Sequence, residues 1–375
     1  MTQRYDVAIV GGGPAGTATA LALAHAGLSS VVLEASHYER VRIGETLPPS
    51  ARAPLAQLRV WERFVGSHHT PSPGNVSAWG RDDLYEQQFI FNADGDGWHL
   101  DRARFDAMLA SEAEHAGVCV HRGARLHSCA ATSPGGDWQL TVAIEGVSRR
   151  LLTGFLVDAS GRASVQARHL GARRVVYDGL VGVAALCPSN AVRDGHGAMT
   201  LVEACDLGWW YSAALPNRQL IVVFMTDADL WPCHRRGALD RWRRQLARTS
   251  HTRARIADLS FDTSLRVATA RTSRLDRLAG PGWLAVGDAA QTFDPLSSQG
   301  ITSALRSGLA AASAIVECAE GDADALLRYQ QQAQIEFDDY LGARFIHYAR
   351  ERRWPESAFW QRRHVRAGDG VAAAS

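Results

Sequence analysis

The chain has 375 residues, of which 46% are hydrophobic and 21% charged, and its formal net charge is +1. This balance is typical of a globular protein with a sizeable core and excludes a strongly basic nucleic-acid-binding chain. No segment holds 18 uninterrupted apolar residues, so we expect no membrane span. Because the first residues lead directly into a strand pattern rather than a signal peptide, we expect a cytoplasmic protein.

Two features of composition limit the chemistry. The cysteines are scattered without a CxxC pair, so we expect reduced thiols and no metal site. The printed sequence contains no lysine, and all 40 of its Lys+Arg residues are arginine. Any mechanism that needs a lysine amine from these residues is therefore excluded.

The N-terminal segment 5–34 predicts a dinucleotide site. An apolar strand is followed by a GxGxxG motif, an Ala- and Leu-rich helix, and a second strand that ends in Glu34. This context is what the fingerprint requires, with the acid available for the adenosine ribose and the helix start for the phosphates. In the motif, Gly11 allows the tight turn, Gly13 the approach of the pyrophosphate and Gly16 close helix–strand packing. The intervening Pro14 and Ala15 are expected at the same phosphates.

A second glycine turn, PGWLAVGDAAQTFDPLSSQGI, lies near residues 281–301. It again places a strand before a turn and a helix after it. Since no second GxGxxG is present for a separate nicotinamide, two distant turns suit one long ligand held at both ends. FAD fits this requirement better than NAD.

Together these motifs resemble the FAD enzymes of glutathione-reductase-like fold, a group that includes aromatic hydroxylases, flavin-dependent halogenases and geranylgeranyl reductases. The resemblance implies that Arg102, in GWHLDRARFDAML, reaches the FAD phosphates and that backbone near Leu126 meets the adenine. It implies a second nucleotide-proximal motif in LVDASGRAS and a flavin strap in RIGETLPPSA. The remaining cofactor residues implied are Arg42, Asp158, Gly161, Asp288, Pro295, Gln299, Gly300 and Ile301.

The resemblance also implies the domain organisation. We expect an α/β fold with a Rossmann-like FAD-binding domain, an inserted antiparallel β-sheet substrate domain and a C-terminal helical segment. The period-two pattern of residues 176–230 supports the inserted sheet. The expected FAD-binding domain is 1–75, 98–175 and 268–335, the substrate domain 76–97 and 176–267, the helical segment 336–365, and a disordered tail 366–375.

Three consecutive aromatic residues, Trp209, Trp210 and Tyr211, fall on one predicted strand. Adjacent strand residues face opposite sides, so Trp209 and Tyr211 share a face and Trp210 takes the other. Both tryptophans are candidates for binding a flat aromatic substrate, with plain core packing as the alternative. Glu45, in the strap, is a further substrate-binding candidate.

Halogenation is the first chemistry to consider, because the strap is similar to that of tryptophan halogenases. Those enzymes use a lysine, which this chain lacks, and a glutamate where this chain has Ser297. Their Trp-x-Trp-x-Ile-Pro motif also differs in spacing from GWWYSAALP. All three signatures therefore disagree with halogenation.

A narrower resemblance rests on GETLPP, GWWYSAALP and RWPESAFWQRRH. These segments resemble flavoprotein maturases that hydroxylate tryptophan in a partner polypeptide. The resemblance implies FAD, O2 as co-substrate, and oxygen transfer to the indole from a flavin C4a-hydroperoxide. NAD(P)H or a separate flavin reductase would reduce the flavin, and free tryptophan, a carrier-tethered aromatic or a tryptophan in a peptide or partner protein remain open as substrates.

The catalytic candidates are Glu203, Tyr211 and Ser298. Burial on an apolar strand would raise the pKa of Glu203 and make it a proton acceptor, although a surface carboxylate is the simpler interpretation. Ser298 could contact the flavin or cap the following helix. Two further functions stay open at this point, those of a geranylgeranyl-reductase-like enzyme and of a non-catalytic flavoprotein partner.

Overall fold

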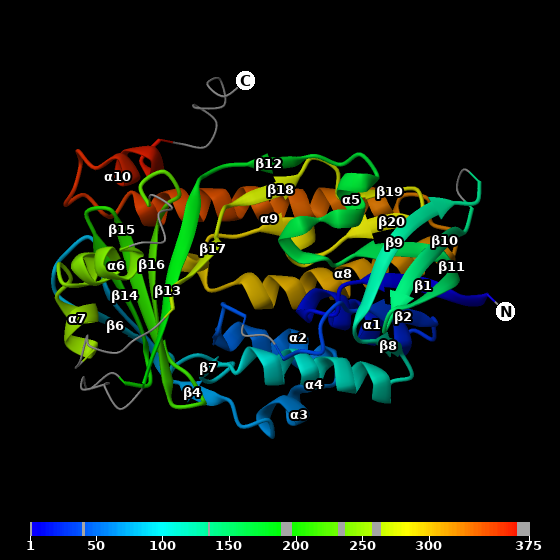
Figure 1. Cartoon of the computed structure of the whole chain (residues 1–375), viewed down its shortest axis with the longest axis horizontal. Coiled ribbons are helices and arrows are strands. Elements are labelled where there is room, and N and C mark those ends of the chain that lie inside the picture. Colours follow the sequence, from blue (N-terminus) through cyan, green and yellow to red (C-terminus); the bar gives the residue numbers. More distant parts are fainter. Residues whose placement is uncertain are drawn as a thin grey trace.

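The computed structural model describes residues 2–39, 42–133, 136–188, 197–231, 237–256 and 264–365. A mainly parallel sheet lies near one end of an elongated molecule and a mainly antiparallel sheet near the other (Figure 1). The long helices α8 (Gly300–Ala319) and α9 (Ala325–Tyr348) run between the two ends. The expected α/β fold class is confirmed, whereas the tail 366–375 lies outside the described residues.

The parallel sheet is built around β1 (Gln3–Val10), which is apolar on both faces as buried parallel strands require. Its order is β19-β20-β11-β1-β2-β8, and β9 and β10 extend it from β11. Val10 lies beside Leu33 and Asp158 at the carboxyl ends of three neighbouring strands, so the turns that follow them meet at one edge. The other strands are β2 (Ser30–Leu33), β8 (Cys119–His121), β9 (Ala124–Ala131), β10 (Trp138–Ile144), β11 (Val147–Asp158), β19 (Ala279–Gly280) and β20 (Trp283–Ala285).

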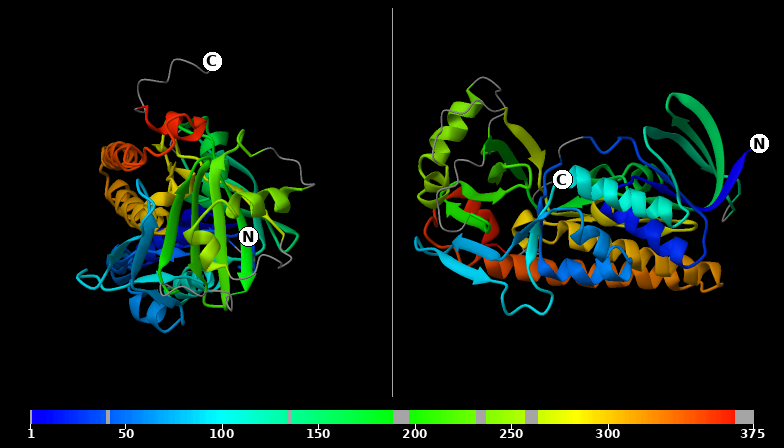
Figure 2. Two further views of the ribbon diagram at one scale, coloured as in Figure 1. Left: turned by 90° about the vertical axis from the view of Figure 1, so that its left-hand side faces the viewer. Right: turned by 90° about the horizontal axis from the view of Figure 1, so that it is seen from below.

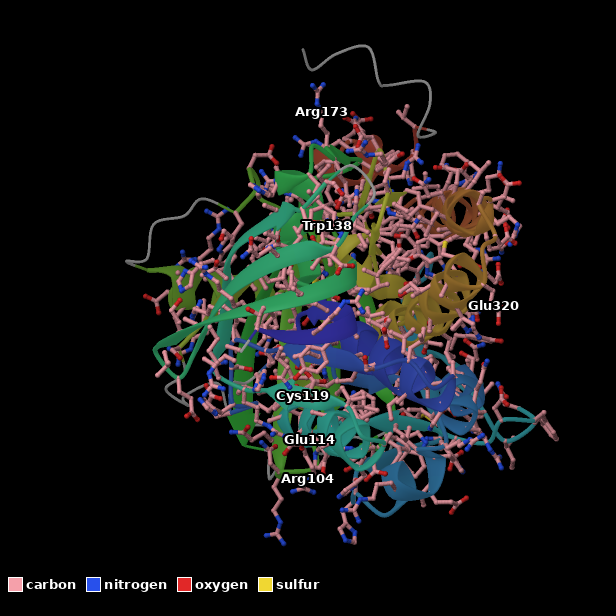
Figure 3. The ribbon with its side chains drawn as sticks, turned by 90° about the vertical axis from the view of Figure 1, so that its right-hand side faces the viewer. Arg104, Glu114, Cys119, Trp138, Arg173 and Glu320 are labelled. Atoms are coloured by element: carbon pink, nitrogen blue, oxygen red, sulfur yellow. The ribbon has the colours of Figure 1, made fainter. Side chains whose placement is uncertain are left out.

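Helix α1 (Pro14–His25) is buried between this sheet and neighbouring helices. Gly308 of α8 allows the closest approach, because an added Cβ would lie 2.7 Å from the Ala15 carbonyl oxygen. Figure 3 shows this end of the molecule, with Glu114 on α4 and Trp138 on β10. The other helices here are α2 (Arg52–Gln57), α3 (Trp61–Val65), α4 (Arg102–His115) and α5 (Val165–His169), with short 3-10 turns η1 (Pro49–Ala51), η2 (Gly161–Ala163), η4 (Gly287–Ala289) and η5 (Pro295–Ser297).

The second sheet has seven strands in the order β17-β13-β16-β15-β14-β5-β6. It is antiparallel except for the parallel pair β14–β5, which agrees with the alternation in the sequence. One face is covered by α6 (Ala238–Leu246) and α7 (His251–Arg255), and the other by the end of α9 and by α10 (Ala358–Arg363) (Figure 2). Its strands are β5 (Gly74–Ala78), β6 (Tyr85–Gln88), β13 (Leu180–Pro188), β14 (Thr200–Cys205), β15 (Gly208–Ala214), β16 (Gln219–Asp227) and β17 (Arg266–Thr269).

Two small sheets complete the structure. The first joins β3 (Thr46–Leu47), β7 (Gly97–His99) and β4 (Thr70–Ser72), and it fixes the segment that carries Glu45. The second joins β12 (Arg174–Val176), β18 (Ser273–Leu275) and β21 (Gln291–Thr292). The first sheet holds part of the strap against the rest of the fold, and the second sheet holds part of the second glycine turn.

Candidate active site

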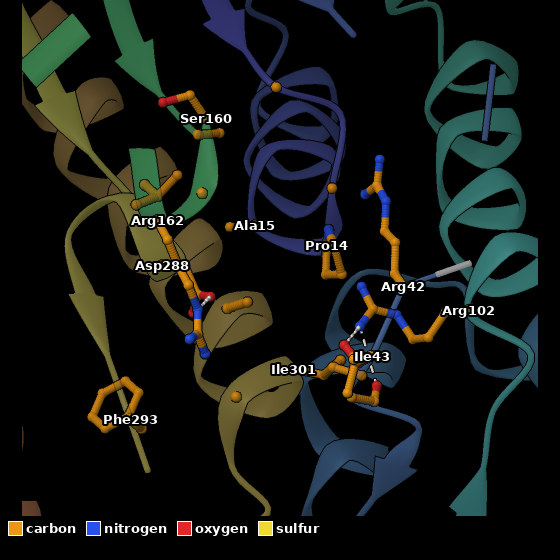
Figure 4. A pocket seen from close by; sticks show the side chains of 18 of the residues that line it. Pro14, Ala15, Arg42, Ile43, Arg102, Ser160, Arg162, Asp288, Phe293 and Ile301 are labelled. Atoms are coloured by element: carbon orange, nitrogen blue, oxygen red, sulfur yellow. Dashed lines mark hydrogen bonds and ion pairs between the residues drawn. The ribbon is translucent and has the colours of Figure 1, made fainter. Parts of the chain in front are cut away.

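A cavity of about 730 Å³ opens at the edge where the parallel strands end, and it continues to the seven-stranded sheet. Figure 4 shows side chains from the first helix, the strap, α4 and the start of α8 around it. Three of the predicted cofactor residues do not line the cavity: Gly16, Asp158 and Gln299. Those that do line it are Gly11, Gly13, Pro14, Ala15, Glu34, Arg42, Arg102, Leu126, Gly161, Asp288, Pro295, Gly300 and Ile301.

The glycine turn has the backbone geometry that the sequence predicts. Gly11 adopts φ +111°, and an added Cβ would lie 2.2 Å from the Ala159 carbonyl oxygen. An added Cβ on Gly16 would lie 2.0 Å from the Gly11 carbonyl oxygen, so this residue serves helix–strand packing rather than the cavity. At Gly13 the corresponding position faces the cavity, with the Arg42 Nη1 atom 3.7 Å away.

Two arginines at the cavity share one buried carboxylate. Arg42 Nη1 donates to Asp106 at 2.8 Å, and Arg102 Nη2 donates to the same oxygen at 3.2 Å. Arg102 also donates to the Ile43 and Gly44 carbonyl oxygens of the strap. Asp106 was not predicted, although its position four residues after Arg102 on a helix was a usable signal.

Two predicted acids bind backbone amides. Glu34 lines the cavity and accepts hydrogen bonds from the Gly12 amide at 2.8 Å and the Ser36 amide at 2.9 Å. Asp158 instead accepts from the Ser160, Gln166 and Ala167 amides, which shapes the turn before α5. We expected Asp158 to contact the cofactor directly. In the structure its side chain instead stabilises the turn that contains Gly161.

The DPLSSQG turn presents the start of α8 to the cavity. Asp294 accepts from the Leu296 amide at 3.0 Å, and Ser298 adopts the left-handed φ of +51°. Ser298 lines the cavity, whereas Gln299 is exposed. Within the described residues no side chain caps this helix, so its first amides remain available to a ligand.

The Glu45 carboxyl group meets the Tyr211 hydroxyl group at the other end of the cavity. Glu45 is 4% exposed and accepts from the Gly44 amide at 2.9 Å, and the Tyr211 phenol lies close enough to influence its pKa. Burial raises the pKa of Glu45 to about 7 and holds the pKa of Tyr211 well above its ordinary value. Trp209, on the same strand face as Tyr211, completes this wall with its ring 6.2 Å from the tyrosine ring.

Glu203 and Trp210 lie on the opposite face of this sheet, so neither lines the cavity. They face each other across the β14–β15 pair. Glu203 accepts from the Ser250, His251 and Thr252 amides at the start of α7, and Trp210 stacks on Phe224 at 4.7 Å. The predicted proton-acceptor role of Glu203 and substrate role of Trp210 are therefore wrong, because strand alternation places both side chains under α6 and α7.

A buried histidine near the same end was not predicted. His99 Nε2 lies 3.0 Å from the Thr200 hydroxyl oxygen, which is 3.5 Å from the Thr46 hydroxyl oxygen. Burial lowers the pKa of His99 to about 4, so the imidazole is neutral near pH 7. Both threonines line the cavity, and the histidine fixes their wall from behind.

The open glycine turn, the uncapped start of α8 and the paired arginines together suit an elongated, phosphate-containing ligand such as FAD. Asp288 is held at the cavity by an ion pair with Arg162 at 3.1 Å. No group of three or more His, Cys, Asp or Glu suited to a metal occurs among the described residues. None of the helices in the described segments is long and apolar enough to cross a bilayer.

Comparisons with known proteins agree with this cofactor. The family model described as "FAD binding domain" matches residues 4–335. The putative FAD-dependent oxidoreductase LodB of Marinomonas mediterranea is 34% identical over 374 residues, which cover 97% of this chain and 98% of LodB. The molecule is therefore an FAD-dependent oxidoreductase. More particularly, the chain belongs to the FAD-binding domain family.

Halogenases and a tryptophan hydroxylase are also similar. The tryptophan 2-halogenase of Chondromyces crocatus is 27% identical over 341 residues, which cover 85% of this chain and 62% of that protein. The myxobacterial chondrochloren halogenase CndH matches with TM-score 0.88 at 22% identity, over 97% of this chain and 86% of CndH. The peptidyl tryptophan dihydroxylase QhpG matches with TM-score 0.79 at 22% identity, over 96% of this chain and 78% of QhpG. At this identity the two structures show a shared fold.

Proposed function

We propose that this protein is a flavin-dependent monooxygenase that hydroxylates the indole ring of tryptophan in a peptide or partner protein. The observation that carries the proposal is the buried Glu45 carboxyl group beside Tyr211 in the cavity that the FAD-binding turns also line. The substrate class follows from the name of QhpG, a peptidyl tryptophan dihydroxylase of the same fold.

Hydroxylating an indole requires one oxygen atom at a ring carbon and the departure of the proton from that carbon. Reduced FAD, when bound, supplies the electrons that activate O2 for this transfer. Glu45 accepts the ring proton, because a carboxyl group with a pKa of about 7 is partly ionised at neutral pH. The Tyr211 hydroxyl group lies beside Glu45 and orients the carboxylate, while Trp209 and Val202 form the apolar wall against which the indole packs.

The turn at the start of α8 has a separate role. Its amides would stabilise negative charge on a reduced flavin bound there, which would favour reaction with oxygen. Ser298 contributes to this turn through its left-handed backbone conformation, and it also lines the cavity. NAD(P)H or a separate flavin reductase supplies the electrons.

Halogenation is the second candidate because several similar proteins are named halogenases. Electrophilic halogenation also removes a ring proton, so Glu45 could serve that reaction equally well. The printed sequence has no lysine, and it has Ser297 where the tryptophan halogenases have glutamate. Both differences favour hydroxylation over halogenation.

The deciding experiment gives the FAD-loaded protein a reductant, ¹⁸O2, chloride and a tryptophan-containing peptide, with free tryptophan in a parallel reaction. Mass spectrometry of the products is expected to show one or more ¹⁸O atoms in the peptide. A chlorine isotope pattern would establish halogenation instead. Flavin that is reduced and reoxidised without any modified product in either reaction would contradict both, and a labelled product from free tryptophan alone would overturn the peptide substrate.

A further inference from the structure

A row of aromatic rings connects the cavity with the surface beside α10. Trp209 lines the cavity, and its ring centroid is 6.4 Å from that of Trp79. Trp79 is 5.4 Å from Trp360, which is 6.1 Å from the partly exposed Trp354. We call Trp209, Trp79, Trp360 and Trp354 the tryptophan chain. Each member lies within the distance at which aromatic rings interact directly with the next.

We propose that the tryptophan chain carries one-electron oxidising equivalents from the cavity to the surface and so protects the active site. This inference rests on FAD binding and not on the hydroxylation proposed above. Oxygen reduction at a flavin that yields no product releases reactive oxygen species in the cavity. A route for electrons from the surface repairs the nearest side chain before it is damaged permanently.

The electron balance involves an oxygen-centred radical and a thiol from the solvent. One further electron from the reductant splits the hydrogen peroxide released in this way into hydroxide and a hydroxyl radical, and the radical takes one electron from Trp209 and becomes a second hydroxide. Trp79, Trp360 and Trp354 then each pass one electron toward the cavity. A thiolate in solution reduces Trp354 and becomes a thiyl radical, and a proton that Trp354 has given to water returns to it, so the protein ends unchanged.

The hydrogen bonds of the chain keep the oxidised state mobile. Trp79 Nε1 donates to the His347 carbonyl oxygen at 3.1 Å, and Trp360 Nε1 donates to the Cys205 carbonyl oxygen at 2.9 Å. Trp209 Nε1 donates to the Tyr348 hydroxyl oxygen at 3.0 Å. Carbonyl oxygens are weak bases, so an oxidised Trp79 or Trp360 keeps its proton. The positive charge therefore passes to the next ring instead of being trapped as a neutral radical.

Charged side chains lie beside Tyr348 and at the surface end of the tryptophan chain. The guanidinium groups of Arg344 and Arg363 lie 5.1 and 5.3 Å from the Tyr348 ring centroid, and Asp178, Asp294 and Asp227 balance their charges. Arg353 lies 4.4 Å from the Trp354 ring, but Glu351 and Asp82 balance its charge. At the surface Trp354 can lose its proton to water, which makes it the end of the path.

Flash photolysis of the FAD-loaded protein under argon tests the inference without any substrate. The excited flavin takes an electron from the nearest aromatic side chain, and the visible absorption of the tryptophan radical reports the movement of the oxidised state. Trp209→Phe is expected to lose most of this signal. Trp79→Phe and Trp354→Phe are expected to form the first radical but to shorten its lifetime, because the charge cannot reach the surface.

Trp210→Phe is the matched control, because Trp210 is a neighbour in sequence on the opposite sheet face. Variants are compared at equal bound FAD, and added thiol is expected to shorten the radical lifetime in the wild type but not in Trp354→Phe. Equal loss of signal in the Trp209 and Trp210 variants would overturn the proposal. A Trp354 variant with wild-type lifetime and thiol sensitivity would also overturn it, even if Trp209→Phe fails to bind FAD.

Discussion

The two faces of the β14–β15 hairpin carry similar residue types but differ in what surrounds them. The inner face presents Trp209 and Tyr211 to the cavity, and the strap brings Glu45 to meet them. The outer face presents Trp210 and Glu203 to α6 and α7. Each face thus pairs a tryptophan with a buried acid.

The two acids differ in the number of groups that donate hydrogen bonds to their carboxylates. Three backbone amides and the Thr252 hydroxyl group donate to Glu203 and fix it as an acceptor in the structure. Glu45 has a neighbouring amide and one tyrosine hydroxyl group, and its pKa is raised to about 7. A buried carboxylate that already receives several donors supports the fold, whereas one with fewer donors can exchange a proton.

The largest expected effect comes from breaking the inner face with Glu45→Gln. Because glutamine cannot accept the ring proton, the rate of product formation should fall by about 10²–10⁴-fold. Product analysis by mass spectrometry at equal bound FAD measures this change. The amide keeps the size of the side chain, and Tyr211→Phe, which removes only the orienting hydroxyl group, should cause a smaller loss. A Glu45→Gln enzyme with normal turnover would show that another group accepts the proton.

On the outer face, Trp210→Ala should act on stability. Trp210 is 0% exposed and stacks on Phe224, so truncation leaves a cavity in a packed cluster. The free energy of unfolding should fall by about 3–5 kcal/mol. Chemical denaturation with bound FAD measures it. An unchanged unfolding curve combined with weaker substrate binding would instead place this tryptophan in the substrate site.

Local motifs could be predicted from the sequence because short-range geometry determines them. The glycine turn requires Gly11 and Gly16 at fixed spacing, and period-two alternation alone placed Trp209 and Tyr211 on one face. What alternation does not specify is which face turns toward the cavity. That depends on α6 and α7 covering the outer side, an arrangement set by tertiary packing.

Contacts between distant segments explain the remaining differences. Glu45 meets Tyr211 only because β3 pairs with β7 and β14 pairs with β5, which brings the strap against the seven-stranded sheet. The shared carboxylate of Asp106 likewise depends on where the strap crosses α4. A single sequence carries no direct signal for such pairings.

Glu203→Gln sharpens the comparison with a smaller effect. Turnover should be unchanged, because the side chain lies under α7, but unfolding free energy should fall by about 1–3 kcal/mol as charged acceptor bonds weaken. Thermal unfolding and product formation are measured on the same preparation. Asp206→Asn is the matched control, since its ion pair with the exposed Arg248 should contribute at most about 1 kcal/mol. Turnover that falls as steeply as in Glu45→Gln would restore Glu203 as the acceptor.

The last comparison between the two acids is the pH dependence of rate and stability. With a pKa of about 7, Glu45 becomes protonated as the pH falls, and the rate should drop about tenfold per unit below that value. Stability should change in the opposite direction. The pKa of Glu45 in the folded protein exceeds its ordinary value of 4.5, so the folded state binds more protons between pH 4.5 and 7, and this contribution to stability is lost as the pH rises through that window. Glu45→Gln should lose both trends, because it removes the carboxyl group with the raised pKa, and Glu203→Gln should keep them, because it leaves Glu45 in place. Rate profiles and denaturation curves from pH 5 to 8 measure both, and identical profiles in the two variants would contradict the assignment of the titration to Glu45.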